Sequence, residues 1–460
     1  MKKFILSAIS IILVLSLFVP VCVMAETSDY TIVDPYEEVI WDGEDAWTAY
    51  KANLHTHSTI SDATTEPRDM ILDHYNQGFD VLAMTDHGVT GKAWNETPTQ
   101  IPLYLYQKII GYTNAPFTDD EFIALQNGTY PVDGEERGYG MTCITGGNEL
   151  NALTLSKDHV NALFLPEHVG DNYLGYENDY EGAVKIAEEN GAICWINHPG
   201  DWLQSNSNRA NCSDEDNINY FADILLRYDS CLGIEVFNER NGVTPYDRDT
   251  WDNLLMACLP YGKTVIGYSN NDAHWHSHVD SSFEMLMMPS NTVDNVRTAV
   301  TNGTLFAVTK VICGDPEKYG PDIDGWLDAS DQGLEQPAFT GIYVDGHKIT
   351  VRFNRAYDLR WVANGNVIDK QLVTETEEDA YYTIDLDQIE GSEDFLYVRC
   401  QLIGEGGITL TQAFVIDDGT EPLTYEKDTS FEAVVKEFFR KFFSLRIFVL
   451  FKVLYYKVVD

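Results

Sequence analysis

Between about residues 50 and 310, short apolar runs alternate with stretches in which apolar residues recur at helical spacing. Pro67 is placed as a first helical residue, the ten residues after it have helical apolar spacing, and Gly78 ends the pattern. The run FDVLAMTDHG that follows predicts a buried strand. The same order returns in EGAVKIAEEN with AICWINHPG, and in YDRDTWDNLLMACLP with KTVIGYSNNDAH. This repetition predicts βα units and a largely parallel sheet, which is an α/β fold.

Polar residues follow the apolar part of each predicted strand, among them His87, His198 and Asp272. Active sites of βα barrels and open α/β sheets form at the carboxyl ends of the strands, so we expect these side chains to meet. In LHTHSTISD, His55 and His57 would face the same side of a strand, about 7 Å apart at their backbones. Alone, such a pair is more typical of polar residues at a strand end than of metal ligands.

The full set of polar strand-end residues changes that interpretation. Burying so many imidazoles and carboxylates without a cation would be costly, because each would need a partner or a shifted pKa. Neutral imidazoles are good ligands for zinc, iron and manganese. The sequence therefore predicts several bound metal ions. The candidate ligands are His55, His57, Asp62, His87, Glu149, His159, His198, Asp272 and His274.

The segments outside residues 50–315 have different patterns of apolar and polar residues. Residues 1–25 carry two lysines, an apolar run and a small-residue cleavage pattern, which predicts a signal peptide and a secreted or cell-surface protein; an uncleaved anchor is the alternative. Residues 26–49 form a short N-terminal lead-in. Residues 325–425 have short alternating runs between turns, which predicts a small antiparallel β-sandwich with a structural or substrate-rim role.

The last segment, residues 428–460, predicts a basic amphipathic helix. It could lie on an anionic membrane surface as a peripheral contact, or pack back onto the rest of the chain. The charged residues Arg446, Lys452 and Lys457 interrupt its apolar sequence and argue against a membrane span.

Charge narrows the range of partners. Residues 26–430 contain 22 Lys and Arg against 70 Asp and Glu. Such a body repels nucleic acid phosphates, so no nucleic-acid role is expected. Seven cysteines follow the leader without CxxC spacing, and Cys194, Cys231 and Cys400 lie in apolar runs, where we expect buried free thiols.

The motifs HTHS with SD, TDHG, GNEL, INHPG and NDAH resemble, in order and spacing, those of the PHP (polymerase and histidinol phosphatase) superfamily of metal-dependent phosphoesterases. The resemblance covers residues 50–315 and implies a distorted seven-stranded βα barrel, similar to a TIM barrel, with two or three divalent ions. It implies one ion held by His55, His57, Glu149 and Asp272. Glu149 would bridge to a second ion on His159 and His198, and Asp62, His87 and His274 would hold a third. His168 could replace His159.

The length, export signal and added β-domain look most like the carbaryl-hydrolase-like branch of that superfamily. The resemblance implies a secreted hydrolase in which metal-bound water is the nucleophile, with a small-molecule phosphoester as the expected substrate. A carbamate, ester or amide hydrolase and a non-catalytic, metal-stabilised surface binding protein are the alternatives. Amidohydrolase barrels also open with HxH, but the other motifs do not follow their pattern.

Further polar residues near the motifs have two interpretations each. Asp86 could orient His87 or cap a turn. His276 and His278 could contact substrate or protonate a leaving group, or could be solvated loop residues. The asparagines that flank predicted ligands, Asn148, Asn197 and Asn271, could bind substrate oxygens or stabilise turns. Basic residues are scarce near the motifs, Arg209 and Arg240 being the nearest in sequence.

Overall fold

The computed structural model describes residues 30–443 except 152–156, 174–178, 241–243, 313–326 and 375–378. The predicted signal peptide and the second half of the predicted tail lie outside the described residues. The predicted helices form where the sequence places them: α2 has Pro67 at its first turn, and α5 and α8 occupy the other two periodic segments. Among the described residues, the α-helices of five residues or more are α2 (Pro67–Asn76), α4 (Asp119–Asn127), α5 (Tyr180–Glu189), α6 (Pro199–Leu203), α7 (Glu215–Arg227), α8 (Asp247–Cys258), α9 (Val293–Asn302) and α10 (Phe431–Phe443).

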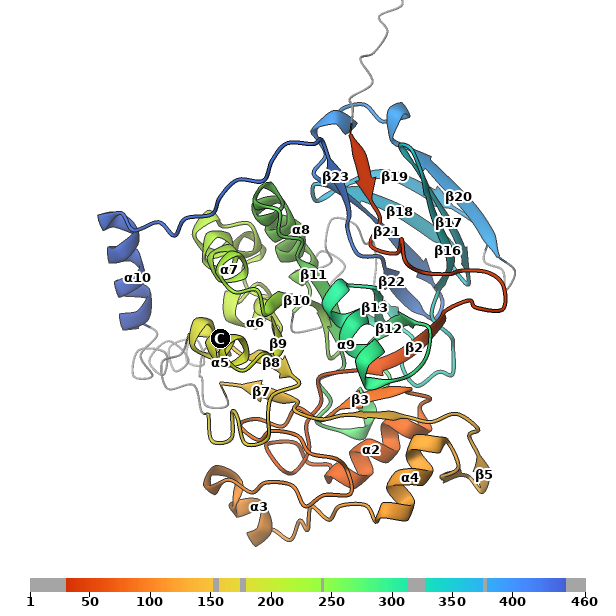
Figure 1. Cartoon of the computed structure of the whole chain (residues 1–460), viewed down its shortest axis with the longest axis vertical. Helices are drawn as coiled ribbons and strands as arrows, with labels where there is room; N and C mark the ends of the chain where they lie inside the picture. Colours follow the sequence, from red (N-terminus) through yellow and green to blue (C-terminus); the bar gives the residue numbers. More distant parts are fainter. Residues whose placement is uncertain are drawn as a thin grey trace, which may run out of the picture.

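A large mixed sheet runs through the molecule from the N-terminal strands to the C-terminal ones (Figure 1). Its main path is, in spatial order, β1 (Thr31–Val33), β23 (Phe414–Asp417), β21 (Tyr397–Gly404), β22 (Gly407–Leu410), β13 (Leu305–Thr309), β12 (Ser282–Met288), β2 (Thr48–Asn53), β3 (Val81–Ala83) and β6 (Thr142–Ile144). Strand β18 (Asp358–Ala363) branches from β21 and carries β19 (Asn366–Leu372).

A second sheet completes the α/β part. Its spatial order is β11 (Ile266–Asn270), β10 (Cys231–Asn238), β9 (Ile193–Ile196), β8 (Val160–Leu163) and β7 (Asn148–Leu150). Strands β9, β10 and β11 are parallel, whereas β7, β8 and β9 pair antiparallel. The prediction of a largely parallel sheet over residues 50–310 is therefore wrong: β8 runs against its neighbours here, and β12 pairs antiparallel with β2 and β13 in the large sheet. Buried apolar runs carry no mark of strand direction.

No sheet among the described residues closes into a barrel, which corrects the predicted closed ring of seven strands. Between β2 and β11, a single bridge joins Thr56 to Ala273. Buried asparagine side chains form hydrogen bonds with the Leu54 backbone there. The Asn270 side chain accepts from the Leu54 N–H at 2.7 Å, and the Asn161 side chain donates to the Leu54 carbonyl at 2.6 Å. Apart from this bridge, hydrogen bonds from asparagine side chains join the two sheets beside β2, where a closed barrel would have a continuous ladder of backbone hydrogen bonds.

The C-terminal strands form the two predicted layers, although the first layer belongs to the large sheet. A three-stranded sheet of β16 (Ala338–Asp345), β17 (Lys348–Asn354) and β20 (Ala380–Asp385) faces it. Alternating residues of both layers, such as Phe339, Val351 and Trp361, share one buried cluster. Strand β22 pairs directly with β13, so the predicted sandwich is continuous with the α/β part.

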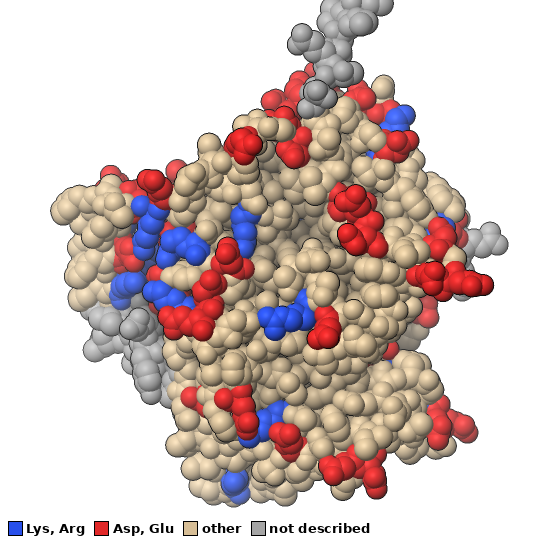
Figure 2. Space-filling model, in the orientation of Figure 1, with Lys and Arg blue, Asp and Glu red and all other residues tan. Residues whose placement is uncertain are grey.

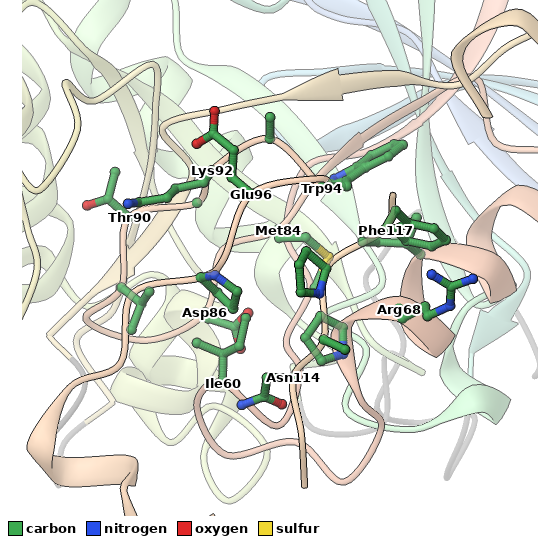
Figure 3. Close-up of a pocket in the computed structure, with 18 residues that line it drawn as sticks. Ile60, Arg68, Met84, Asp86, Thr90, Lys92, Trp94, Glu96, Asn114 and Phe117 are labelled. Carbon is green, nitrogen blue, oxygen red and sulfur yellow. The ribbon is translucent and has the colours of Figure 1, made fainter. Parts of the chain in front are cut away.

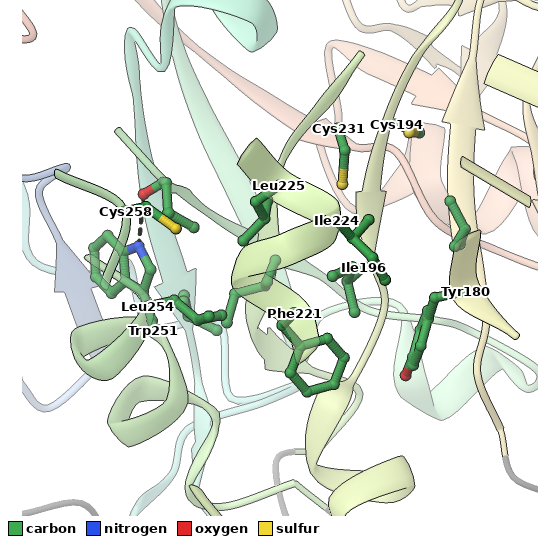
Figure 4. Packing of buried hydrophobic residues seen from close by; sticks show 14 of the residues in the cluster. Tyr180, Cys194, Ile196, Phe221, Ile224, Leu225, Cys231, Trp251, Leu254 and Cys258 are labelled. Carbon is green, nitrogen blue, oxygen red and sulfur yellow. Dashed lines mark hydrogen bonds between the residues drawn. The ribbon is translucent and has the colours of Figure 1, made fainter. Parts of the chain in front are cut away.

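Helices α7 and α8 cover one face of the second sheet. Phe221, Trp251 and Leu254 are fully buried against β9 and β10, and the Trp251 indole donates to the Val265 carbonyl at 2.8 Å (Figure 4). Cys194 and Cys231 lie in this cluster as free thiols, and Cys400 is buried in the other layer, as predicted. In the part of the chain described here, no helix has the length and apolar character needed to cross a membrane.

Candidate metal centre

The candidate ligands meet at one edge of the two sheets. His55 and His57 follow β2, His87 follows β3, His198 follows β9, and Asp272 follows β11. His159 precedes β8 yet reaches the same edge, because β8 runs antiparallel to β9 and its amino end lies beside the carboxyl end of β9. The Asn197 amide donates to the His159 carbonyl at 3.1 Å, which fixes these two strand ends side by side.

Glu149, at the middle of β7, is the hub of the cluster. Its two carboxylate oxygens lie 3.0–3.2 Å from ring nitrogens of five histidines, which are His55, His57, His87, His159 and His198. Asp272 Oδ1 lies 3.2 Å from His55 Nε2 and 3.1 Å from His57 Nε2. All of these side chains except His159 are buried.

Hydrogen bonds on the far ring nitrogens favour Nε2 as the acceptor that faces the centre when these rings are neutral. The Nδ1–H of His55 donates to Glu235 at 2.8 Å, and that of His87 donates to the Glu149 carbonyl at 3.2 Å. His274 likewise donates through Nδ1 to the Asp272 carbonyl at 2.9 Å. Each neutral ring then presents an Nε2 lone pair to the cluster, as metal-binding histidines do.

The spacing between these acceptors fits coordination by a cation. In a neutral cluster, the Nε2 lone pairs of His55 and His87 would face carboxylate oxygens of Glu149 at 3.2 Å with no hydrogen between them. Ligands bonded at about 2.0–2.1 Å to one octahedral or tetrahedral ion are separated by roughly 2.8–3.4 Å. The donor set and its distances therefore suit divalent metal ions, which would remove the repulsion between lone pairs.

The pKa shifts show the same demand for positive charge. Burial alone would lower the pKa of His55 and His57, but Asp272 and Glu149 hold it well above its usual value. Burial would raise the pKa of Glu149, and the surrounding imidazoles hold it well below its usual value. At His87 burial prevails and lowers the pKa to about 4. Without another cation, protons on some of these rings would balance the carboxylates.

The three predicted ligand groups are brought together to different degrees. His55, His57, Glu149 and Asp272 form one compact buried group. His159 Nδ1 and His198 Nε2 each lie 3.2 Å from Glu149 Oε1. The third group is wider: Asp62 lies 3.7 Å from His87 Nε2 and 3.5 Å from His274 Nε2, and 43% of its side chain is exposed. His168, the alternative to His159, is exposed and pairs with Asp171 outside the cluster.

Asp86 holds the loop between His57 and Asp62. Its carboxylate accepts from the backbone amides and hydroxyls of Ser58 and Ser61 at 2.6–3.1 Å. The same residue lines a cavity of about 50 Å³ between Ile60 on one side and Trp94 and Phe117 on the other (Figure 3). That volume holds a few waters and is too small for a substrate. The geometry gives Asp86 a positioning role through the loop.

The other predicted polar residues lie around the rim or away from it. His276 is exposed and pairs with Asp73 of α2, so the structure does not bring it to the cluster. His278 packs on the Trp275 ring, 3.7 Å from Glu239. Asn197 donates to Glu149 at 2.7 Å, whereas Asn271 donates to the Val279 carbonyl and Asn148 to Thr90. Arg209 and Arg240 form ion pairs with Asp249 and Asp328.

Two functional candidates were not found from the sequence. Glu235, fully buried in β10, orients His55, and Glu239 lies near Asp272 and His274 in a further group of possible ligands. Burial, with Asp272 next, raises the pKa of Glu239 to about 7. A single carboxylate inside the apolar run GIEVF was the available signal for Glu235, since such a group needs a buried partner.

Comparisons with known proteins do not assign a family. No protein-family model matches the chain, and no curated protein matches it. Similar solved structures include a Bacteroides vulgatus two-domain protein described as containing a predicted PHP-like metal-dependent phosphoesterase, at 15% identity and a TM-score of 0.40, over 82% of this chain and 97% of that one.

Two other similar structures have lower scores. One is a lesion-specific endonuclease from Pyrococcus furiosus, at 15% identity and a TM-score of 0.30, over 55% of this chain and 56% of that one. The other is a Bifidobacterium adolescentis protein whose description as a metal-dependent phosphoesterase is itself a prediction. It has 16% identity and a TM-score of 0.28, over 55% of this chain and 96% of that one. None of the three is described as a carbaryl hydrolase.

Proposed function

We propose that the chain is a metal-dependent hydrolase of the PHP type that cleaves a phosphoester of a small molecule with two or three divalent ions. The observation that carries this proposal is the sharing of Glu149 by five imidazoles at metal-ligand spacing. When bound, clustered divalent ions would lower the pKa of water, polarise the scissile bond and stabilise the leaving oxygen.

The protein residues would hold and orient this centre. His55, His57, Glu149 and Asp272 would form the buried floor, with His159 and His198 beside Glu149 Oε1. Glu235 fixes the His55 ring through Nδ1, and Asp86 fixes the loop that carries Asp62. No protein nucleophile is needed in this scheme.

Substrate would approach from the side where the ligands are partly exposed. Asp62 is 43% exposed, Glu239 23% and His274 18% at their side chains, whereas His55 and His57 are inaccessible. Trp275, 48% exposed, lies against His274 and His278 at this rim. The open side is thus bounded by the third, wider group of candidate ligands.

Charge favours a phosphoester over a neutral carbamate. The ligand set that the PHP resemblance implies contains three carboxylates, Asp62, Glu149 and Asp272, against a charge of four to six on two or three divalent ions. Glu235 and Glu239 add two nearby carboxylates. With three divalent ions the loaded site would still carry net positive charge, which complements an anionic phosphoryl group and gives a neutral carbamate no such gain.

The test combines metal analysis with turnover of p-nitrophenyl phosphate, bis-p-nitrophenyl phosphate and an aryl carbamate. We expect at least two bound ions and turnover of a phosphoester. His87→Ala should lose bound metal and at least about 100-fold in turnover, while the matched His168→Ala, outside the cluster, should keep both. Carbamate turnover alone would overturn the substrate class. Bound metal without any turnover would favour a binding protein, and no bound metal would reject the centre.

A further inference from the structure

The C-terminal helix α10 presents two faces of different chemistry. Phe431, Val434 and Phe438 lie on one face and are 86%, 52% and 61% exposed. Phe438 and Phe442 stack at 6.1 Å along that face. The opposite face carries Ala433, Glu437 and Arg440, which line the space between α10 and the body. Apolar side chains of this size do not stabilise the helix while they face water.

The basic residues of α10 are engaged with the body of the protein. Lys436 pairs with Asp216 at 3.1 Å, Lys441 lies 3.5 Å from Asp179, and Arg440 lies over the Tyr220 ring at 4.1 Å. Figure 2 shows basic and acidic side chains interleaved in this region, and Figure 1 shows α10 standing apart from α5 and α7. A cavity of about 720 Å³ separates them. The contact is polar, so it does not account for the aromatic face.

The sequence that follows α10 indicates what covers this face. Twelve of the seventeen residues 444–460 are apolar, with three cations and one acid. Residues 447–451 are apolar without interruption, and five consecutive apolar positions leave no polar side in a helix. A groove on a soluble partner needs a stripe of apolar residues, whereas the lipid boundary accepts such a run with interspersed cations.

We propose that the aromatic face of α10 binds the surface of a phospholipid bilayer, while Lys436 and Lys441 tie the helix to the acidic face of α5 and α7. The bilayer is favoured over a second copy of the chain because residues 26–430 carry 22 basic against 70 acidic residues, and two such bodies repel each other. The lysines are held by the body, so the apolar face makes the main lipid contact and the binding depends weakly on lipid charge.

Sedimentation with phosphatidylcholine vesicles tests this proposal. All proteins begin at Glu26, since the apolar leader would itself bind lipid. We expect binding to these uncharged vesicles that persists in 0.5 M NaCl. At this salt concentration the Debye length is roughly 4 Å, so exposed charges farther apart are screened from one another. Phe431→Ser, Val434→Ser and Phe438→Ser together should weaken it by at least about 100-fold, since binding scales with apolar area buried.

A matched variant controls for surface apolarity. Ile109, Leu372 and Tyr381 are 85%, 76% and 63% exposed elsewhere, and serine at these three positions should leave vesicle binding unchanged. Metal content of both variants reports an intact body, and deletion of residues 428–460 should abolish binding. Binding that requires anionic lipid and is lost in salt, or that survives the α10 variant, would overturn the proposal. A dimer in sedimentation equilibrium that the α10 variant dissociates, without vesicle binding, would assign the face to a second copy.

Discussion

Replacing Glu235 by glutamine tests how the orientation of the His55 ring affects metal binding, because all the candidate ligands remain in place. The two carboxylate oxygens accept four hydrogen bonds: one oxygen accepts from His55 Nδ1 at 2.8 Å and from Asn270 at 3.2 Å, and the other from the His198 amide at 3.1 Å and from Asn238 at 2.9 Å. Glutamine has one acceptor oxygen, so its NH₂ group must face two of these donors.

Either orientation of the amide disturbs the candidate metal centre. With NH₂ toward His198, Asn238 can turn its own amide to accept, but the His198 N–H cannot, and it stays buried without an acceptor. With NH₂ toward His55, the ring must carry its proton on Nε2, the nitrogen that faces Glu149 and Asp272. An unsatisfied buried group costs about 1–3 kcal/mol and each lost bond to a charged acceptor about 1.5–3, so the metal-free protein should lose roughly 3–5 kcal/mol.

Metal affinity should fall as well, by about 10–100-fold, which is the usual effect of removing a partner of a ligating histidine. Competition with a chelating dye measures the affinity, and urea unfolding of the metal-free protein measures the stability. Glu284 on β12 supplies the control, because it is also fully buried and burial raises its pKa well above the usual value. Glu284→Gln should leave metal affinity unchanged. Normal affinity in Glu235→Gln, or an equal loss in both variants, would refute the positioning role.

Three further predictions concern the frame around the site. The fully buried His74 has its pKa lowered to about 4, chiefly by burial, so its share of stability is complete above the unfolded value of about 6.5 and is lost as pH falls toward 4. Between neutral and acidic pH, the free energy of unfolding of the metal-free protein, measured in urea, should fall by about 3 kcal/mol less in His74→Gln than in the unaltered protein. An equal fall in both proteins would contradict this. Asp252 accepts both Arg399 bonds at 2.9 Å and the Tyr397 hydroxyl at 2.6 Å between α8 and β21, so Asp252→Ala should cost about 3–5 kcal/mol, and a cost below about 1 kcal/mol would show that the buried charge finds another partner. A Cβ at Gly147 would lie 2.5 Å from the Met84 carbonyl oxygen, so Gly147→Ala should push the ends of β3 and β7 apart. Metal binding should weaken, and the free energy of unfolding should fall by about 1–3 kcal/mol. An unchanged metal affinity in dye competition would count against this.

The sequence predicted the elements better than their connections. Strong periodicity placed α2, α5 and α8, and the alternation of apolar runs placed the strands that carry His87, His198 and Asp272. The reversal of β8 relative to β7 and β9 was not predictable, because a buried strand has the same composition in either direction. The missing ladder between β2 and β11 depends on buried asparagines, whose partners lie more than 100 residues away in sequence.

The candidate site divides in the same way. Residues next to strand ends were found because position along the chain implies position at the sheet edge. Glu235 was missed because it sits within β10, where its only local signal is a charge among apolar neighbours. His276 was placed near the ligands by sequence proximity, but the short helical turn after Trp275 carries it to Asp73. Direction of a loop side chain is set by tertiary contacts that spacing does not encode.

The acidity of the body and the chemistry proposed for the site act over different distances. A chain with 73 Asp and Glu against 30 Lys and Arg repels anionic molecules at long range, which at first opposes a phosphoester substrate. At physiological ionic strength, however, exposed charges are screened beyond about 8 Å. Metal-ligand distances are much shorter, and the buried floor around Glu149 is poorly screened. In the proposed function, the net charge of the loaded centre would therefore decide which substrate binds, while the acidic surface would favour the arrival of the divalent cations.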